Sequence, residues 1–203
     1  MSESPIVLGE QPLSVDDIVA IAERGRHVAL SDEPGFRTRL AAGARALADR
    51  LAAGEAVYGV TTGFGESCVT EVPDEQVAEL PLNLLRYHGC GTGRIFDPVE
   101  SAAIVAVRLA SLVRGWSAVR VELVERLCAL LDARVLPRIP AEGSVGASGD
   151  LTPLSYVAAL LIGERECWLE GHEASAAEGL ASLGLARLRL APKESLAIMN
   201  GTS

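Results

Sequence analysis

The spacing of apolar residues along the chain predicts a protein built mainly from helices. In residues 36–51 the apolar side chains recur every three or four positions, and the pattern stops at Gly54, a residue that suits a helix C-terminus. Residues 101–113 are apolar on nearly every side, which predicts a helix enclosed by others. Residues 121–135 are amphipathic, and the prolines that follow are expected to end that helix. These segments predict helices packed on helices.

Short stretches of a different pattern predict a few strands at the edge of this helical core. Residues 56–60 form a short β-forming run, residues 186–192 alternate between apolar and polar side chains, and residues 166–174 predict a hairpin. The sequence has no internal repeat and no clear linker. The expected fold class is mainly α, with a few short peripheral strands.

A glycine-rich segment, GSVGASGDLTP at residues 143–153, is a candidate for chemistry. Thr152 can cap a helix and Pro153 can occupy its first turn, so a helix is expected to run from there to Gly163. Ser148 then lies just before a helix N-terminus, where the helix dipole and free N–H groups favour developing negative charge. An electrophile or an anion would be stabilised at this position.

The residues alone leave several interpretations of this segment open. Its glycines could simply supply positive φ angles in a loop. A phosphate-binding loop is a weaker interpretation, because no lysine follows the glycines. A serine-hydrolase elbow fits in form only, because GASGD departs from the G-x-S-x-G pattern. Cys90 near His88 offers a thiol nucleophile, although closeness in sequence is poor evidence for such a pair.

The charge and the cysteine content limit which partners the protein can bind and which cellular compartment it can occupy. The 27 acidic residues outnumber the 18 lysines and arginines, which gives a formal net charge of −9, and no basic stripe is present that could follow phosphates. The four cysteines lack the close pairs that zinc and redox sites use. The sequence shows no signal-peptide pattern, and no apolar run reaches the ~18 residues of a membrane span. We therefore expect a soluble, reduced, cytoplasmic protein that binds no metal, nucleic acid or membrane.

The glycine-rich segment resembles the signature of the aromatic amino acid ammonia-lyases and aminomutases, the family of the histidine, phenylalanine and tyrosine ammonia-lyases. In that family an Ala-Ser-Gly triplet cyclises and dehydrates into a methylidene-imidazolone electrophile. The triplet here is Ala147, Ser148 and Gly149. Cyclisation presses the Gly149 nitrogen onto the Ala147 carbonyl, which only small residues in a tight bend allow. The resemblance implies that the group forms autocatalytically, without a metal, and that Asp150 assists.

A second segment, VYGVTTGFGE at residues 57–66, is similar to the family's loop that carries the catalytic tyrosine. The resemblance implies that Tyr58 is the base and that Gly65 borders the substrate. A tyrosine base must be held where its anion is favoured, and the positive ends of helices converging on the site would provide this.

Two further segments match the family in the same order along the chain. NLLRYHGCGTG resembles the segment that selects the substrate, which implies that Tyr87 and His88 contact it. LAIMNGTS is similar to the segment whose asparagine contacts the prosthetic group or the substrate, which here is Asn200. The match covers essentially the whole chain.

The resemblance implies elimination of ammonia from an aromatic L-amino acid to give an aryl acrylate. The electrophile makes the amine a better leaving group while the base removes the weakly acidic β-proton. His88 can hydrogen-bond a polar ring, which favours tyrosine or histidine over phenylalanine. Histidine-specific members usually read Ser-His at positions 87 and 88 and Asn-Gly-Thr-Gln at the end, so Tyr87 departs from their pattern and the ending in Ser203 favours tyrosine, which would give p-coumarate. A histidine ammonia-lyase or an aromatic aminomutase is the alternative.

Members of this family are more than twice as long as the chain. The resemblance therefore implies that residues 1–195 form the domain that bears the prosthetic group and that residues 196–203 begin a truncated central helical bundle. It also implies a helical partner chain or a missing C-terminal half, and a homotetramer. A free end at Ser203 would leave Leu196, Ile198 and Met199 with little C-terminal structure to pack against. A non-catalytic or partner-dependent half of a split lyase is a further alternative, although the intact site residues argue against a decayed enzyme.

Overall fold

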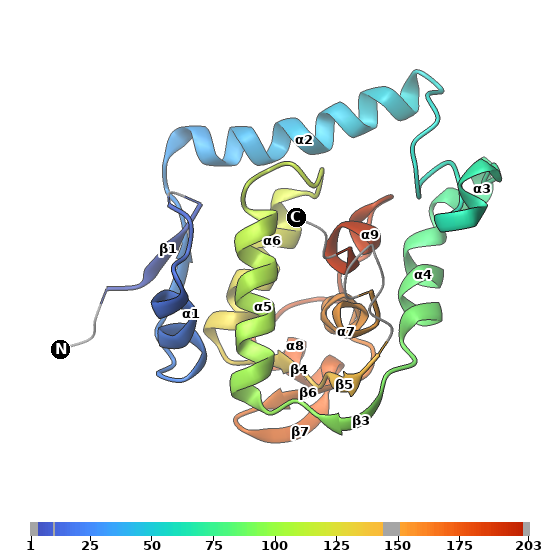
Figure 1. Cartoon of the computed structure of the whole chain (residues 1–203). Helices are drawn as coiled ribbons and strands as arrows, with labels where there is room; N and C mark the ends of the chain where they lie inside the picture. Colours follow the sequence, from blue (N-terminus) through green and yellow to red (C-terminus); the bar gives the residue numbers. More distant parts are fainter. Residues whose placement is uncertain (1–3, 10, 144–150, 201–203) are drawn as a thin grey trace.

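The computed structural model describes residues 4–9, 11–143 and 151–200, and helices dominate it (Figure 1). The helices are α1 (Val15–Ala22), α2 (Pro34–Ala52), α3 (Asp74–Val77), α4 (Leu80–His88), α5 (Pro98–Leu112), α6 (Val121–Asp132), α7 (Leu151–Leu161), α8 (Ala176–Ser182) and α9 (Glu194–Met199), with a 3-10 helix at Gly65–Val69. The strands are β1 (Ile6–Leu8), β2 (Val28–Leu30), β3 (Thr92–Ile95), β4 (Leu136–Pro137), β5 (Pro140–Glu142), β6 (Glu166–Leu169) and β7 (His172–Ser175). The predicted mainly α fold class is confirmed.

The helices are arranged around α7. α4 and α9 pack on α7 and on each other, α8 packs on its other side, and α5 packs on α1, α6 and α9. In Figure 1 α2 lies across the top of this group, and the two antiparallel sheets, β3–β5 and β4–β6–β7, lie at the opposite end. The parallel pair β1–β2 contacts α6 through β2. The small sheets thus border a helical core, as the sequence predicts.

The core is most complete at α7. Every residue from Leu154 to Leu161 is buried, so this helix has no solvent-facing side. The prediction that residues 101–113 form a fully enclosed helix is wrong on one side, because Val107 of α5 is exposed. Within the described ranges, no helix is both long and apolar enough to cross a membrane.

The predicted hairpin is confirmed. β6 and β7 pair antiparallel in register from Glu166 opposite Ser175 to Leu169 opposite His172. Both residues of the connecting turn have positive φ angles, 52° at Glu170 and 78° at Gly171. This is the backbone shape that two-residue hairpin turns require.

Two other predicted strands are wrong. Residues 56–60 form a turn, in which the backbone N–H groups of Val60 and Thr61 both donate to the carbonyl of Val57 at 3.0 Å. Residues 186–192 are irregular and contain no assigned strand, and the amide of Leu188 donates to the carbonyl of Leu161 at the end of α7. Their alternating pattern reflects single leucines that pack on the helices, because no neighbouring strand pairs with this segment.

The predicted end of the helix in residues 121–135 is also wrong. α6 stops at Asp132, before Pro137 can act, and Arg134 takes a left-handed backbone conformation with φ of 58°. The prolines instead lie in the short strands β4 and β5.

The end of the described chain is packed rather than free. All residues of α9, including Leu196, Ile198 and Met199, are buried against α4, α5 and α7. These apolar side chains are buried without any C-terminal structure, because helices earlier in the chain supply the packing partners.

The start of α9 is anchored by a buried carboxylate. The Glu194 side chain is 1% exposed and accepts hydrogen bonds from Nε and Nη2 of Arg120 at 2.9 and 2.8 Å. It also accepts from the backbone N–H groups of Arg120 and Ala191. These donors compensate the burial of the charge and fix α9 to the segment that begins α6.

Replacing Arg120 with Met should lower the free energy of unfolding by about 3 kcal/mol, because Glu194 would stay buried without its cation. Urea denaturation measures this loss. Arg37→Met is the matched control, since Arg37 pairs with Glu125 where both side chains are largely exposed, and it should cost less than about 1 kcal/mol. Equal losses in the two variants would contradict the anchoring role of Arg120.

Candidate active site

The loop that carries Tyr58 rests directly on α9. At Gly59, which has a φ of +68°, a Cβ atom would lie 2.6 Å from Cδ2 of Leu196 and 2.7 Å from Cε1 of Phe64. Glycine suits this position because it adopts the left-handed conformation readily and has no Cβ to collide with Leu196. The contact brings Tyr58 to the helix that ends just before Asn200.

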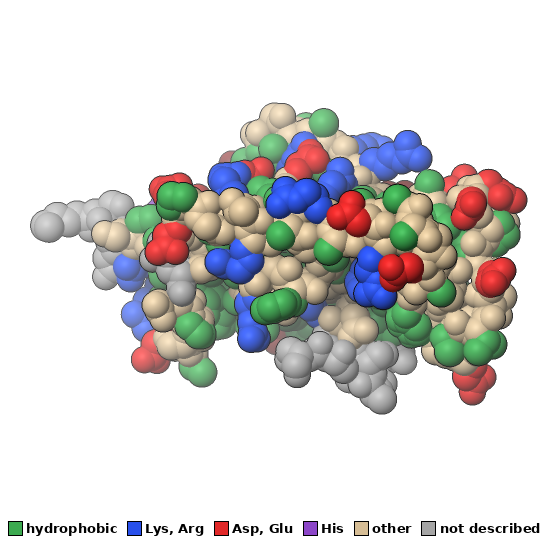
Figure 2. All heavy atoms as spheres, turned by 90° about the horizontal axis from the view of Figure 1, so that it is seen from above, with side chains coloured by type: hydrophobic (Ala, Val, Ile, Leu, Met, Phe, Trp, Pro, Cys, Tyr) green, Lys and Arg blue, Asp and Glu red, His purple; other side chains and the backbone are tan. Residues whose placement is uncertain are grey.

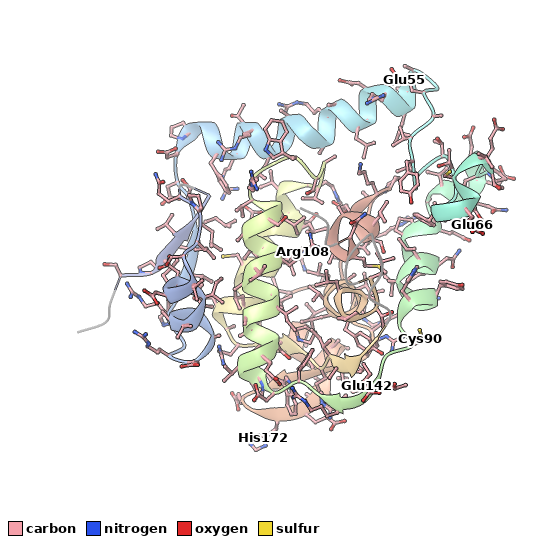
Figure 3. All side chains as sticks on the ribbon, in the orientation of Figure 1. Glu55, Glu66, Cys90, Arg108, Glu142 and His172 are labelled. Atoms are coloured by element: carbon pink, nitrogen blue, oxygen red, sulfur yellow. The ribbon has the colours of Figure 1, made fainter. Side chains whose placement is uncertain are left out.

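α9 links this loop to the other predicted segments. It packs on α4, which ends at His88, and on α7, which follows the glycine-rich segment. In Figure 3 Glu66 and Cys90 mark the places where the loop and α4 end, on the same side of the molecule. The structure therefore places Tyr58, His88 and Asn200 on adjoining elements.

The Tyr58 hydroxyl is bound by the backbone of its own loop. It accepts a hydrogen bond from the N–H of Gly65 at 3.0 Å, and its ring meets Phe64 edge to face with 6.4 Å between the centroids. Tyr58 is 50% exposed, so one side is open to a ligand. Gly65, predicted to border the substrate, thus also contacts the candidate base.

His88 is held in one tautomer by its own helix. Its Nδ1 lies 3.0 Å from the carbonyl oxygen of Leu84, which can only accept, so Nδ1 carries the hydrogen. In the neutral imidazole Nε2 is then an acceptor. Tyr87 is 82% exposed, and its ring lies edge to face with His88 at 5.1 Å between the centroids. The Nδ1 bond goes to Leu84 and not to Cys90, so the geometry does not support a Cys–His nucleophile.

The end of α4 is tied to the end of α7 by two arginines. Arg165 donates to the carbonyl of Gly89 at 2.8 Å, and Arg86 binds Glu164 through two hydrogen bonds. The bonds from Arg86 hold the pKa of the Glu164 carboxyl below its usual value. These contacts fix the position of His88 relative to α7.

Asn200 ends α9, and a buried arginine binds its carbonyl. Nη2 of Arg108, on α5, donates to the Asn200 oxygen at 2.5 Å, and Arg108 is only 8% exposed. Figure 3 shows Arg108 on the side of α5 that faces α9. Sequence reasoning missed this residue, although a single base inside the apolar run of residues 101–113 is a signal that could have found it.

The predicted triplet, residues 147–149, and Asp150 lie outside the described residues, but both flanks of the segment are described. A Cβ on Gly143 would lie 2.8 Å from Cβ of Thr152 and 3.3 Å from Cδ of Pro153. The segment therefore begins and ends at the first turn of α7. Thr152, predicted to cap this helix, is instead its second residue and is buried.

A comparison with protein families identifies this arrangement. The model described as aromatic amino acid lyase matches residues 13–203. The chain belongs to this family.

Individual aromatic amino acid lyases are similar over nearly the whole chain. A histidine ammonia-lyase of Sorangium cellulosum is 47% identical over 195 residues, which cover 95% of this chain and 38% of that protein. Among solved structures, ergothionase of Treponema denticola has a TM-score of 0.91 at 29% identity. The match covers 97% of this chain and 39% of the ergothionase chain. Tyrosine aminomutase of Streptomyces globisporus has a TM-score of 0.90 at 37% identity, covering 98% of this chain and 37% of that one. The chain thus spans about two fifths of the length of these relatives.

The comparisons confirm some predictions from the sequence, fail to support one, and leave others untested. The resemblance to the aromatic amino acid lyases and their helical fold are confirmed. The preference for tyrosine is not supported, because the matched curated relatives are histidine ammonia-lyases. The roles of the individual site residues stay predictions.

Replacing Gly143 with Ala should disturb the point where the glycine-rich segment meets α7, because the added methyl group would collide with Thr152. We expect a loss of about 1–3 kcal/mol in the free energy of unfolding, the usual cost of overpacking. Urea denaturation measures the loss. Gly35→Ala is the control, since nothing lies within 4 Å of a Cβ there, and a comparable loss in that variant would contradict the prediction.

Proposed function

We propose that this chain is part of an enzyme that eliminates ammonia from L-histidine and releases an imidazolyl acrylate. The observation that carries the proposal is the 47% identity to a histidine ammonia-lyase over 95% of the chain. This substrate replaces tyrosine, which the sequence favoured partly through Ser203, a residue outside the described part of the chain. An aromatic aminomutase is the second candidate, supported by the likeness to tyrosine aminomutase.

The geometry of His88 is compatible with an imidazole substrate. Because Nδ1 donates to Leu84, Nε2 is left to accept a hydrogen bond. An imidazole N–H can donate this bond, and a phenol can donate it as well, whereas a phenyl ring cannot. His88 therefore separates polar rings from phenylalanine but does not by itself separate histidine from tyrosine.

The residues of the glycine-rich segment would form the prosthetic group of the proposed enzyme. Gly143 and the first turn of α7 meet without room for a Cβ, which suits a segment that must fold on itself, and α7 directs its N-terminus toward the segment. Ala147, Ser148 and Gly149 would provide the methylidene-imidazolone, with help from Asp150 in its formation. When present, the group supplies an electrophile that makes the amine a better leaving group.

The described residues then serve the proton and the substrate. Tyr58 removes the β-proton, and the Gly65 N–H, which donates to its hydroxyl oxygen at 3.0 Å, holds the side chain in place. Asn200 contacts the reacting groups from the end of α9. Gly65 and Tyr87 border the substrate on the two sides that the loop and α4 provide.

We further propose that the activity needs a C-terminal half or a helical partner that packs on the face between α2 and α5. An open groove there has two adjoining parts of about 640 and 420 Å³, which share Arg39, Arg114 and Trp116. Trp116 is 85% exposed, and Figure 2 shows several basic side chains along this face. Exposed apolar surface with an aromatic side chain is typical of a surface that another element covers. We expect the completed enzyme to be a cytoplasmic homotetramer.

The proposed reaction is tested on this chain alone and on the completed enzyme, meaning the chain together with its C-terminal half. The intact mass should fall by two waters as the triplet cyclises, and Ser148→Ala should keep its full mass and lose all activity. L-histidine should be preferred over L-tyrosine and L-phenylalanine in direct competition. A preference for L-tyrosine would overturn the proposal that L-histidine is the substrate. Turnover by the chain alone would overturn the need for a partner, and labelling of Ser148 by a serine-directed phosphonate would favour a hydrolase.

Tyr58→Phe should keep the prosthetic group and lose roughly 10²- to 10⁴-fold in kcat, because a general base is removed without disturbing the ring. The near-ultraviolet band of the electrophile and steady-state kinetics measure the two effects. Tyr156→Phe is the matched control, since Tyr156 is buried in α7 beneath the guanidinium of Arg165. An unimpaired Tyr58→Phe enzyme would leave Tyr58 with a packing role only.

A further inference from the structure

Arg108 is the single charged residue in the apolar run of residues 101–113. On α5 it lies among buried side chains, and Leu109 and Leu112 beyond it are fully enclosed. A guanidinium stays charged at any physiological pH, and burying it costs free energy unless hydrogen bonds replace the lost water. The groups that Arg108 binds therefore show where this charge is compensated.

One of those groups is the carbonyl of Asn200. Nη2 of Arg108 lies 2.5 Å from that oxygen, and the backbone N–H of Asn200 donates to Leu196 at 2.8 Å. Both backbone polar groups of Asn200 are thus bound, one within α9 and the other by α5. Asn200 has left the helical conformation, with φ of −76° and ψ of 113°. A cation at the C-terminal end of a helix is also favoured by the helix dipole.

α9 depends on such contacts at its ends. It has six residues, and a helix of that length is not stable on its own in water. The pair of Arg120 and Glu194 fixes its start, and Arg108 binds the residue just after its end. The peptide groups of Asn200 set the direction of its Cα–Cβ bond, so the hydrogen bond from Arg108 to the carbonyl restrains that bond.

We propose that Arg108 is a positioning residue that aims the Asn200 amide at the reacting groups. The inference rests on the proposed function, in which Asn200 contacts the prosthetic group or the substrate. Without the guanidinium the Asn200 carbonyl loses its hydrogen bond to α5, and the amide leaves its productive position. Substrate still binds through the other groups of the site, so kcat falls while KM stays nearly constant.

The test compares Arg108→Met and Arg108→Lys in the completed enzyme with L-histidine. Arg108→Met should lose about 100-fold in kcat, the effect of a small misplacement of a reacting group, with KM changed less than about 3-fold. Arg108→Lys keeps a cation that can reach the carbonyl, and it should recover at least about 10-fold of the loss. The electrophile's near-ultraviolet band should be unchanged in both variants.

Arg134→Met is the matched control. Arg134 also donates to carbonyls at the end of a helix, those of Ile21 and Ala22 in α1, both at 3.0 Å. α1 packs on α5 and not on α9, so this arginine does not contact the predicted site. Its loss should lower the melting temperature but leave kcat within about 3-fold. A kcat loss equal to that of Arg108→Met would mean a general effect on folding and would overturn the proposal.

A double-mutant cycle decides whether Arg108 acts through Asn200. If it does, Arg108→Met combined with Asn200→Ala should be no slower than Asn200→Ala alone, because the amide to be positioned is gone. Losses that multiply would overturn the inference.

The proposed function and this inference fail in different ways. A wild-type enzyme that turns over no aromatic amino acid overturns both. An active wild-type enzyme with an unimpaired Arg108→Met variant overturns the inference alone. If the wild type prefers L-tyrosine, the cycle is measured with L-tyrosine and decides the same question.

Discussion

The burial of α7 from Leu154 to Leu161 is the constraint on which the rest of the arrangement depends. A helix with no polar side must be surrounded, and α4, α8 and α9 enclose it together with the short strands β4 and β5. Gly143 and Thr152, the described flanks of the glycine-rich segment, meet at the first turn of this helix. The other predicted site residues lie on elements that pack against α7 or on a loop that rests on such an element. A single buried helix thereby organises residues that are distant in the sequence.

Much of this fold follows from local pattern. The helices with long apolar periodicity and the hairpin at residues 166–174 are where the sequence predicts them, because periodicity and turn residues act over a few positions. The alternation in residues 186–192 misleads, since Leu188 and Leu190 are buried by neighbouring helices and no strand pairs with them. The same limitation applies to α9, whose burial depends on helices far away in the sequence.

Less of the candidate site than of the fold could be predicted from the sequence. Its sequence motifs identify the family and its candidate residues, but they contain no information on hydrogen-bond partners such as Gly65 for Tyr58 or Leu84 for His88. Arg108 belongs to no motif and was missed, because its importance comes from a contact across 92 positions of the chain. Substrate choice depends on small differences between polar rings, and a single histidine that accepts one hydrogen bond does not encode that choice.

The close approach at Gly59 has a mechanical consequence. The backbone of the loop touches the side chain of Leu196 with no Cβ between them, so the loop and α9 behave as one body at that point. Tyr58 precedes this contact by one residue and Asn200 follows it by four, so a shift of the loop or of α9 would be transmitted to the other across Leu196.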